Sequence, residues 1–260
     1  MIKGLRVQLE GIKVAFSGRM AYRADFFISS AIMLAGDLMI PLATFLIYRS
    51  GASFPGWNLY EVLLIQGVFM LSRGVAFSLF FGVVWNTLSS VREGTFDLIL
   101  LKPHPALHTS MAVSFSCDNL GIVLGGLVLI SAALFHLSPV SPVNAVLFIL
   151  LLLISLLVLL SFAVIMAATV FKWVGNSRVY EIFDSMTLFG QYPATIFSKS
   201  FAGLLTWLIP ISMIAFIPSS VLLGKPVKAV AVSVAVSVLL FISSILLWSR
   251  MIKKYTSAGG

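Results

Sequence analysis

The stretch AVLFILLLLISLLVLLSFAVIMAATVF, residues 145–171, decides the fold of this chain. It carries no charged residue, and the only formal charge anywhere between Lys102 and Lys172 is Asp118. A helix needs roughly 20 predominantly apolar residues to cross the hydrocarbon core of a bilayer. Residues 145–171 exceed that length, so they are predicted to form a membrane-spanning helix.

The chain on either side has the same character. Hydrophobic residues occupy 60% of its 260 positions and charged residues only 10%, whereas roughly a quarter of the residues in a soluble domain are charged. This composition predicts an all-α integral membrane protein. With no internal repeat and no second domain visible, residues 1–260 are predicted to form a single transmembrane domain. Six apolar stretches are long enough to be spans: 26–48, 59–85, 111–135, 145–171, 201–223 and 229–248.

The fifth span is ambiguous. Residues 201–223 contain Pro210 and Pro218, which would break a straight helix. Either 201–223 is nevertheless the fifth span, or about 177–197 spans and 201–223 dips back from the outer face as a re-entrant element. Irregular backbone of that kind is tolerated in a membrane where protein or a water-filled cavity covers it. Charge counting does not separate the two alternatives.

Residues 1–25 are predicted to form an amphipathic interfacial helix. Apolar residues recur at spacings of three and four, which places them on one helical face, and basic residues lie toward the other side. Such a helix rests in the headgroup layer with its basic residues in water. The apolar face comprises Ile2, Leu5, Leu9, Ile12, Phe16 and Met20, and the basic residues are Lys3, Arg6 and Lys13.

The distribution of Lys and Arg predicts that both termini are cytoplasmic. Cytoplasmic loops of membrane proteins carry an excess of these residues, and the net charge of +8 therefore reflects topology and contact with anionic lipid rather than nucleic-acid binding. The outer loops would hold only Arg49, Lys225 and Lys228. The inner segments would hold Lys3, Arg6, Lys13, Arg19, Arg23, Arg92, Lys102, Lys172, Arg178, Arg250, Lys253 and Lys254.

Motifs for catalysis or cofactor binding are missing from the sequence. It has no G-x-x-x-x-G-K-[ST] phosphate loop, no dinucleotide fingerprint and no H-E-x-x-H, so the chain is not expected to hydrolyse ATP. His104 and His108 are four residues apart, but Pro105 lies between them and no third ligand follows at zinc spacing. The single Cys117 excludes an internal disulfide. No enzyme activity, cofactor or metal is expected in this chain.

Two charges inside the apolar stretches are expected to pair. Asp37 and Arg73 each lie roughly 17 Å from the inner end of their spans, at 1.5 Å per residue, and the two spans are antiparallel neighbours. Charges at such depth are costly and usually have a partner. The pair either locks the hairpin or lines a substrate path. A proton relay would have only Asp118 to add to it.

A charged segment, SSVREGTFDLILLKPHPAL at residues 89–107, interrupts the apolar runs. Within the inner loop 86–110 it is predicted to form a short helix, a break at Gly94 and a second short helix that ends before Pro103. The segment could be a solvated linker. Its apolar residues exceed what a free loop needs, however, and this mixture of charged and apolar residues favours docking to a soluble partner.

The sequence of this segment, VREGTFDLILLKP, resembles the cytoplasmic segment of permease subunits of type-2 ABC exporters. The similarity extends over most of the chain, and it includes FGQYPATIF at 189–197 and LIPISMIAFIPSSVLLGK at 208–225. The resemblance implies that residues 1–25 are an elbow helix and that 86–101 contain a coupling helix. It also implies that the outer re-entrant element begins near Tyr192 and Pro193, which favours 177–197 as the fifth span. The matching coupling residues are Arg92, Glu93, Gly94, Thr95, Phe96 and Asp97.

The function implied by this resemblance is that of a permease subunit in the bacterial cytoplasmic membrane. It would form half of an export pathway together with a second, identical or related permease. An ABC ATPase dimer, carrying ATP and Mg, would dock through residues 88–101. The alternative is an ion-coupled secondary transporter using Asp37, Arg73 and Asp118, but such transporters are commonly built from repeated halves, which this sequence lacks.

Overall fold

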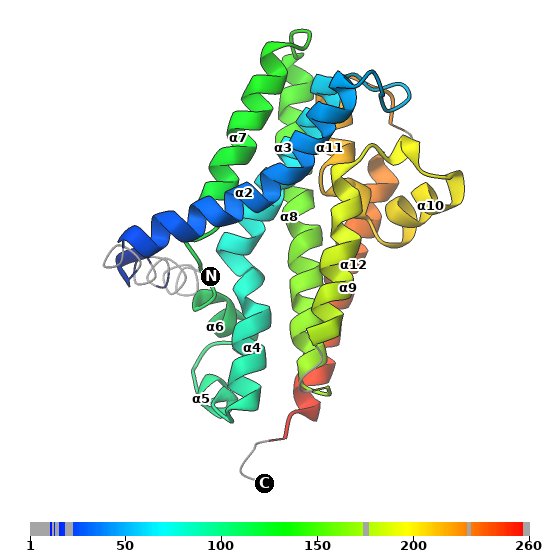
Figure 1. The fold of residues 1–260 in the computed structure, drawn as a ribbon. Coiled ribbons are helices and arrows are strands. Elements are labelled where there is room, and N and C mark those ends of the chain that lie inside the picture. Colours follow the sequence, from blue (N-terminus) through cyan, green and yellow to red (C-terminus); the bar gives the residue numbers. More distant parts are fainter. Residues whose placement is uncertain are drawn as a thin grey trace.

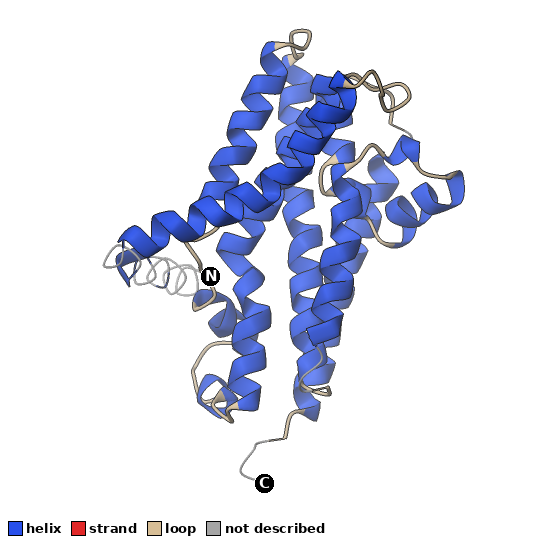
Figure 2. Ribbon diagram, in the orientation of Figure 1, coloured by secondary structure: helices blue, strands red, loops and turns tan. Residues whose placement is uncertain are grey.

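The computed structural model of the chain describes residues 11, 13, 16–18, 23–173, 177–227 and 230–256. In these ranges the protein is built of helices and contains no strand (Figure 2). Most of the predicted interfacial helix at residues 1–25 lies outside them, since only residues 11, 13, 16–18 and 23–25 of it are described. The all-α prediction is therefore confirmed for the described part of the chain.

The first half of the described chain runs through α2 to α7 (Figure 1). Its long helices are α2 (Arg23–Arg49) and α3 (Leu59–Ala76), and α3 continues through the π-helical turn η1 (Phe77–Phe81) into α4 (Gly82–Arg92). The short helices α5 (Phe96–Leu100) and α6 (Ala106–Ala112) precede α7 (Leu120–Phe135). The span predicted at 59–85 thus belongs to a helical unit that continues to Arg92.

The second half contains two long helices separated by an irregular segment. These are α8 (Pro142–Val170) and α12 (Val230–Met251). Between them lie α9 (Ser177–Thr187), α10 (Lys199–Gly203) and α11 (Phe216–Leu222). Figure 1 shows α5 and the last turns of α8 and α12 at one end of the molecule, and the α2–α3 and α7–α8 connections at the other.

Four helices in the described ranges are long and apolar enough to cross a membrane. They are Arg23–Arg49, Leu59–Arg92, Pro142–Val170 and Val230–Lys254. The apolar helix α7 is shorter than these four. The predicted spans at 26–48, 59–85, 145–171 and 229–248 are confirmed as helices of sufficient length, and the total of six spans stays a prediction.

The span predicted at 111–135 is wrong in its first third, because α7 begins only at Leu120. The preceding residues form a turn stabilised by side chains. The backbone N–H of Asp118 donates to Oγ of Ser116, and the backbone N–H of Ser116 donates to the carbonyl of Ser78. Hydroxyl and carboxylate side chains that bond to nearby backbone compete in this way with the helical ladder.

Neither range proposed for the fifth span forms one continuous helix. In 177–197, α9 ends at Thr187 and is followed by the 3₁₀ turns Leu188–Gln191 and Ala194–Ile196. The range 201–223 contains the π-helical turn Leu204–Leu208 and the 3₁₀ turn Ile211–Met213 before α11. Pro193 and Pro210 lie at two of these breaks, where a proline cannot supply the backbone donor that a helix requires.

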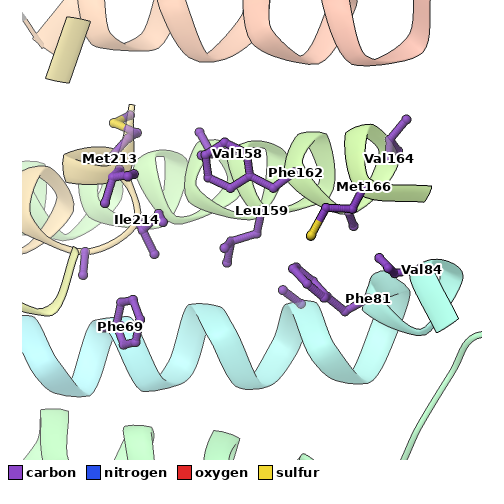
Figure 3. Close-up of a cluster of buried hydrophobic side chains, with 14 of the residues drawn as sticks. Phe69, Phe81, Val84, Val158, Leu159, Phe162, Val164, Met166, Met213 and Ile214 are labelled. Atoms are coloured by element: carbon purple, nitrogen blue, oxygen red, sulfur yellow. The ribbon is translucent and has the colours of Figure 1, made fainter. Parts of the chain in front are cut away.

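The core lies between the Leu59–Arg92 unit and α8. Figure 3 shows Phe69, Phe81 and Val84 on the first helix facing α8, with Leu159 and Met166 on the second facing them. All five side chains are at most 5% exposed. This contact fixes the two helices that carry the rest of the fold.

Glycine allows α7 to approach its neighbours closely. A Cβ added at Gly126 would lie 2.6 Å from the backbone nitrogen of Leu71 on α3, and one at Gly121 would lie 2.7 Å from the carbonyl oxygen of Ser30 on α2. Small residues at such crossings let helix backbones pack directly against each other. The glycines of α7 therefore position α2 and α3, which hold the two charges predicted to pair.

Candidate functional site

Three charged side chains from three helices meet beside α3. Arg73 donates from Nη1 to Oδ1 of Asp37 on α2 at 3.1 Å and from Nη2 to Oδ1 of Asp184 on α9 at 2.9 Å. The side chains of Arg73, Asp37 and Asp184 are 19%, 16% and 28% exposed. A planar guanidinium with several fixed donors can serve two carboxylates at once, which a lysine ammonium does less well.

Asp184 was not foreseen as the partner of Arg73 from the sequence. It is one of several charges on the predicted span 177–197, and it is separated from Arg73 by 111 positions. Local pattern does not indicate contacts over such a distance. Arg73 belongs to α3 and pairs with one residue of α2 and one of α9. The cluster therefore links three helices.

Aromatic rings continue from this cluster along the Leu59–Arg92 unit. The guanidinium of Arg73 lies 5.1 Å from the ring centre of Phe77, which stacks on Phe81 at 4.2 Å. One turn further on, Trp85 lies 4.8 Å from Tyr180 of α9. Phe77 and Phe81 are the first and last residues of η1, and single π-helical turns within α-helices occur frequently at functional sites.

These side chains line a cavity of about 700 Å³ between α2, the Leu59–Arg92 unit and α9. Asp37 and Arg73 lie in its wall together with Asp118, so one cavity contains the three charged residues that the sequence places within or beside the apolar spans. Gln191, which follows α9, also lines it and is 6% exposed. The lining is otherwise mostly apolar, so the cavity offers a few polar groups in an apolar surround, which is typical of small-molecule sites.

The predicted coupling segment lies at the end of the molecule where α4 stops. The α4 helix ends at Arg92, and Gly94 adopts a φ of 70° that terminates it before α5 begins at Phe96. Glycine adopts this left-handed conformation without the steric cost that a Cβ brings. The predicted break at Gly94 and the second short helix are therefore confirmed, whereas the helix before the break is the end of the long Leu59–Arg92 unit and not a separate short helix. The docking role of the segment stays a prediction.

The apolar residues of this segment divide into two groups. Phe96 is fully buried, with its ring 5.0 Å from that of Phe171 after α8 and 5.2 Å from that of Tyr255 near the C-terminus. Leu98 and Leu101 are 62% and 81% exposed. The segment is thus anchored through Phe96 and exposes an apolar surface through the leucines.

The charged residues matched to the coupling segment lie at its tip. Arg92, Glu93 and Thr95 are exposed, whereas Asp97 is half-buried. Gly94, between them, is partly exposed. Charge and apolar surface are therefore displayed side by side at this end of the protein.

The remaining candidates from the sequence do not form a site. No group of three or more His, Cys, Asp or Glu residues in the described ranges could hold a metal ion. Cys117 is buried, and His108 is exposed in the first turn of α6, whose neighbours supply no further ligand.

The family described as "ABC-2 family transporter protein" matches residues 31–259. No curated protein and no solved structure gave a match. The matched range includes the Arg73 cluster, the cavity and the segment around Gly94. Together with its apolar spanning helices, this match shows that the chain belongs to the ABC-2 transporter family and is a type-2 ABC transporter permease.

Proposed function

We propose that this chain is the permease subunit of an ATP-driven exporter in a bacterial cytoplasmic membrane, with both termini in the cytoplasm. It forms half of the translocation pathway. A second permease, identical or related, forms the other half. An ABC ATPase dimer binds ATP and Mg and docks on residues 88–101.

The division of the segment into an exposed tip and a buried anchor is the observation that carries this proposal. A partner protein can contact Glu93 and the exposed leucines without disturbing the fold. Phe96 connects that contact to Phe171 and Tyr255, which follow α8 and α12. A push on the tip is therefore passed to two spanning helices through close-packed rings, because packed interiors transmit displacement rather than absorbing it.

The surface of α2 supports a second permease beside this one. Only 11% of its spanning window is buried within the chain, and Phe27, Ile32 and Leu46 are each at least 58% exposed. Lipid can cover such a surface. Because the cavity is also walled by α2, a second copy placed along α2 would enclose the path from the side, and lipid would fill the rest.

The test is co-expression of the tagged chain with candidate ABC ATPase subunits from the same genome. We expect the two to co-purify, with ATP hydrolysis in the complex and none in the permease alone, because the sequence has no phosphate loop. ATP hydrolysis by the rigorously purified chain would contradict the proposal. So would transport by the chain alone, driven by a proton or sodium gradient, which is the outcome that a secondary transporter predicts.

A further inference from the structure

We infer that the cavity beside Arg73 binds amphipathic organic cations, and that this class is what the permease exports. The substrate class rests on the proposed function, but the binding site is a property of this chain alone. Three independent features of the cavity lead to it: its charge, its aromatic wall and a glutamine amide that is open to the cavity.

The charge of the site is negative. Asp37 and Asp184 share the single guanidinium of Arg73, so two negative charges and one positive charge leave a formal net charge of −1. Asp37 and Arg73 line the cavity, Asp184 pairs with Arg73 from outside the described lining, and neither Lys nor His is among the described lining residues. In a region of low dielectric this excess attracts a cation more strongly than it would in water.

An anion is disfavoured by the same geometry. Both terminal nitrogens of Arg73 already donate to carboxylates, at 3.1 and 2.9 Å. An anionic group could use only the remaining N–H donors of Arg73, and it would then lie close to two carboxylates that already compensate this guanidinium, so like charges would repel it.

The aromatic wall provides the second feature. The rings of Phe77, Phe81, Trp85 and Tyr180 line the cavity around its charged end. Organic cations are attracted to the faces of such rings, most strongly to tryptophan, and Trp85 is 43% exposed. An amphipathic organic cation can therefore place its charge near the carboxylates and its hydrophobic groups against the rings.

Gln191 provides the third feature. Its side chain is 6% exposed and lines the cavity, yet the amide forms no hydrogen bond with any other described residue. The amide atoms are not among the fully enclosed unpaired polar atoms of the structure, so the amide is open to the cavity that the residue lines. A ligand with a polar group, or a water held beside it, would satisfy this amide from within the cavity. The volume of about 700 Å³ lies within the range of drug-sized ligand sites.

The test compares three probes that share one aryl frame and differ in charge. Methyltriphenylphosphonium is a cation, triphenylphosphine oxide is neutral, and triphenylphosphine monosulfonate is an anion. Binding is measured with the full-length permease in nanodiscs, after subtraction of binding to empty nanodiscs of the same lipid. We expect the cation to bind on the order of tenfold more tightly than the neutral probe and the anion to bind no better than the neutral one.

Variants locate the binding. Trp85→Ala and Gln191→Leu should each weaken binding of the phosphonium several-fold, and Asp37→Asn should reduce the preference for the cation over the neutral probe. Trp207→Ala removes a tryptophan of similar exposure, 49%, that does not line the cavity, and it should leave binding unchanged. Thermal stability of each variant shows whether the fold is retained, and Asp37→Asn keeps the shape of the side chain.

The outcomes separate this inference from the proposed function. Equal binding of the three probes, or equal effects of Trp85→Ala and Trp207→Ala, would overturn the inference even if the permease assembles with an ATPase. A cation preference lost in Trp85→Ala would support it even if no ATPase co-purifies. In an assembled complex, the phosphonium should also stimulate ATP hydrolysis, and the neutral probe should not.

Discussion

Arg73 on α3 and Asp184 on α9 form an ion pair of 2.9 Å although 111 positions separate them. The same guanidinium holds Asp37 on α2. Its double pairing has a direct consequence for stability: removing either carboxylate leaves Arg73 one partner, whereas removing Arg73 leaves both carboxylates without their counter-ion.

Replacement of the three residues should therefore have unequal effects. Arg73→Leu should destabilise the permease by about 3 kcal/mol, because it strands partly buried carboxylates. Asp37→Asn should cost only about 1 kcal/mol, the scale of one hydrogen bond, because Arg73 keeps its pairing with Asp184. Unfolding of each variant by heat or denaturant in detergent measures the order of these losses of stability. In the double variant Arg73→Leu, Asp37→Asn, part of the loss should be recovered. Simple addition of the two single effects would show that the residues do not interact energetically.

Reversal of charge at the tip of the coupling segment should disconnect transport from ATP hydrolysis. Glu93→Lys places the wrong sign on an exposed position, so the fold should lose little stability, while docking to a charged groove is sensitive to sign. Asp97→Lys should act in the same direction. Assembly with the ATPase and transport are measured together with thermal stability. Glu181→Lys, an exposed carboxylate of α9, is the control and should assemble normally. Normal assembly and transport in Glu93→Lys and Asp97→Lys would show that the segment is a solvated linker.

Mutations in the buried anchor of this segment and in its exposed apolar surface should have different effects on stability and on ATPase binding. Phe96→Ala removes a fully buried ring and should cost about 3–5 kcal/mol, the usual range for a core aromatic. Leu101→Ala changes a side chain that is 81% exposed and should leave stability within about 0.5 kcal/mol while it weakens ATPase binding. Stability and complex formation are measured for both. Equal loss of stability in the two variants would contradict the division into anchor and surface.

Gly126 should tolerate no side chain. A Cβ there would meet the backbone nitrogen of Leu71 at 2.6 Å, whereas one at Gly36 on α2 would meet nothing within 4 Å. Gly126→Ala should therefore destabilise the permease by about 1–3 kcal/mol through overpacking. Gly36→Ala should be neutral or slightly stabilising, since alanine favours the helix. Thermal unfolding of the pair measures the difference, and similar melting temperatures would show that α3 and α7 can separate without cost.

The sequence by itself determined the long helices. Residues 142–170 and 230–251 form α8 and α12 because an uninterrupted apolar run must satisfy its backbone hydrogen bonds within itself in a bilayer. The break at Gly94 was equally local, since a left-handed residue between two helices favours glycine. The pairing of Asp37 with Arg73 was expected from their matched depths, and the two side chains lie 3.1 Å apart.

Only the tertiary structure decided what these elements contact. The burial of Phe96 depends on Phe171 and Tyr255, and the start of α7 at Leu120 depends on a backbone bond from Ser116 to Ser78. The irregular segment after Thr187 and the pairing of Arg73 with Asp184 likewise depend on tertiary contacts. Hydrophobic periodicity predicts which residues are buried, but it does not predict which neighbouring residues they pack against. That choice is made by packing between helices far apart in sequence, and it is what placed Asp184 beside Arg73.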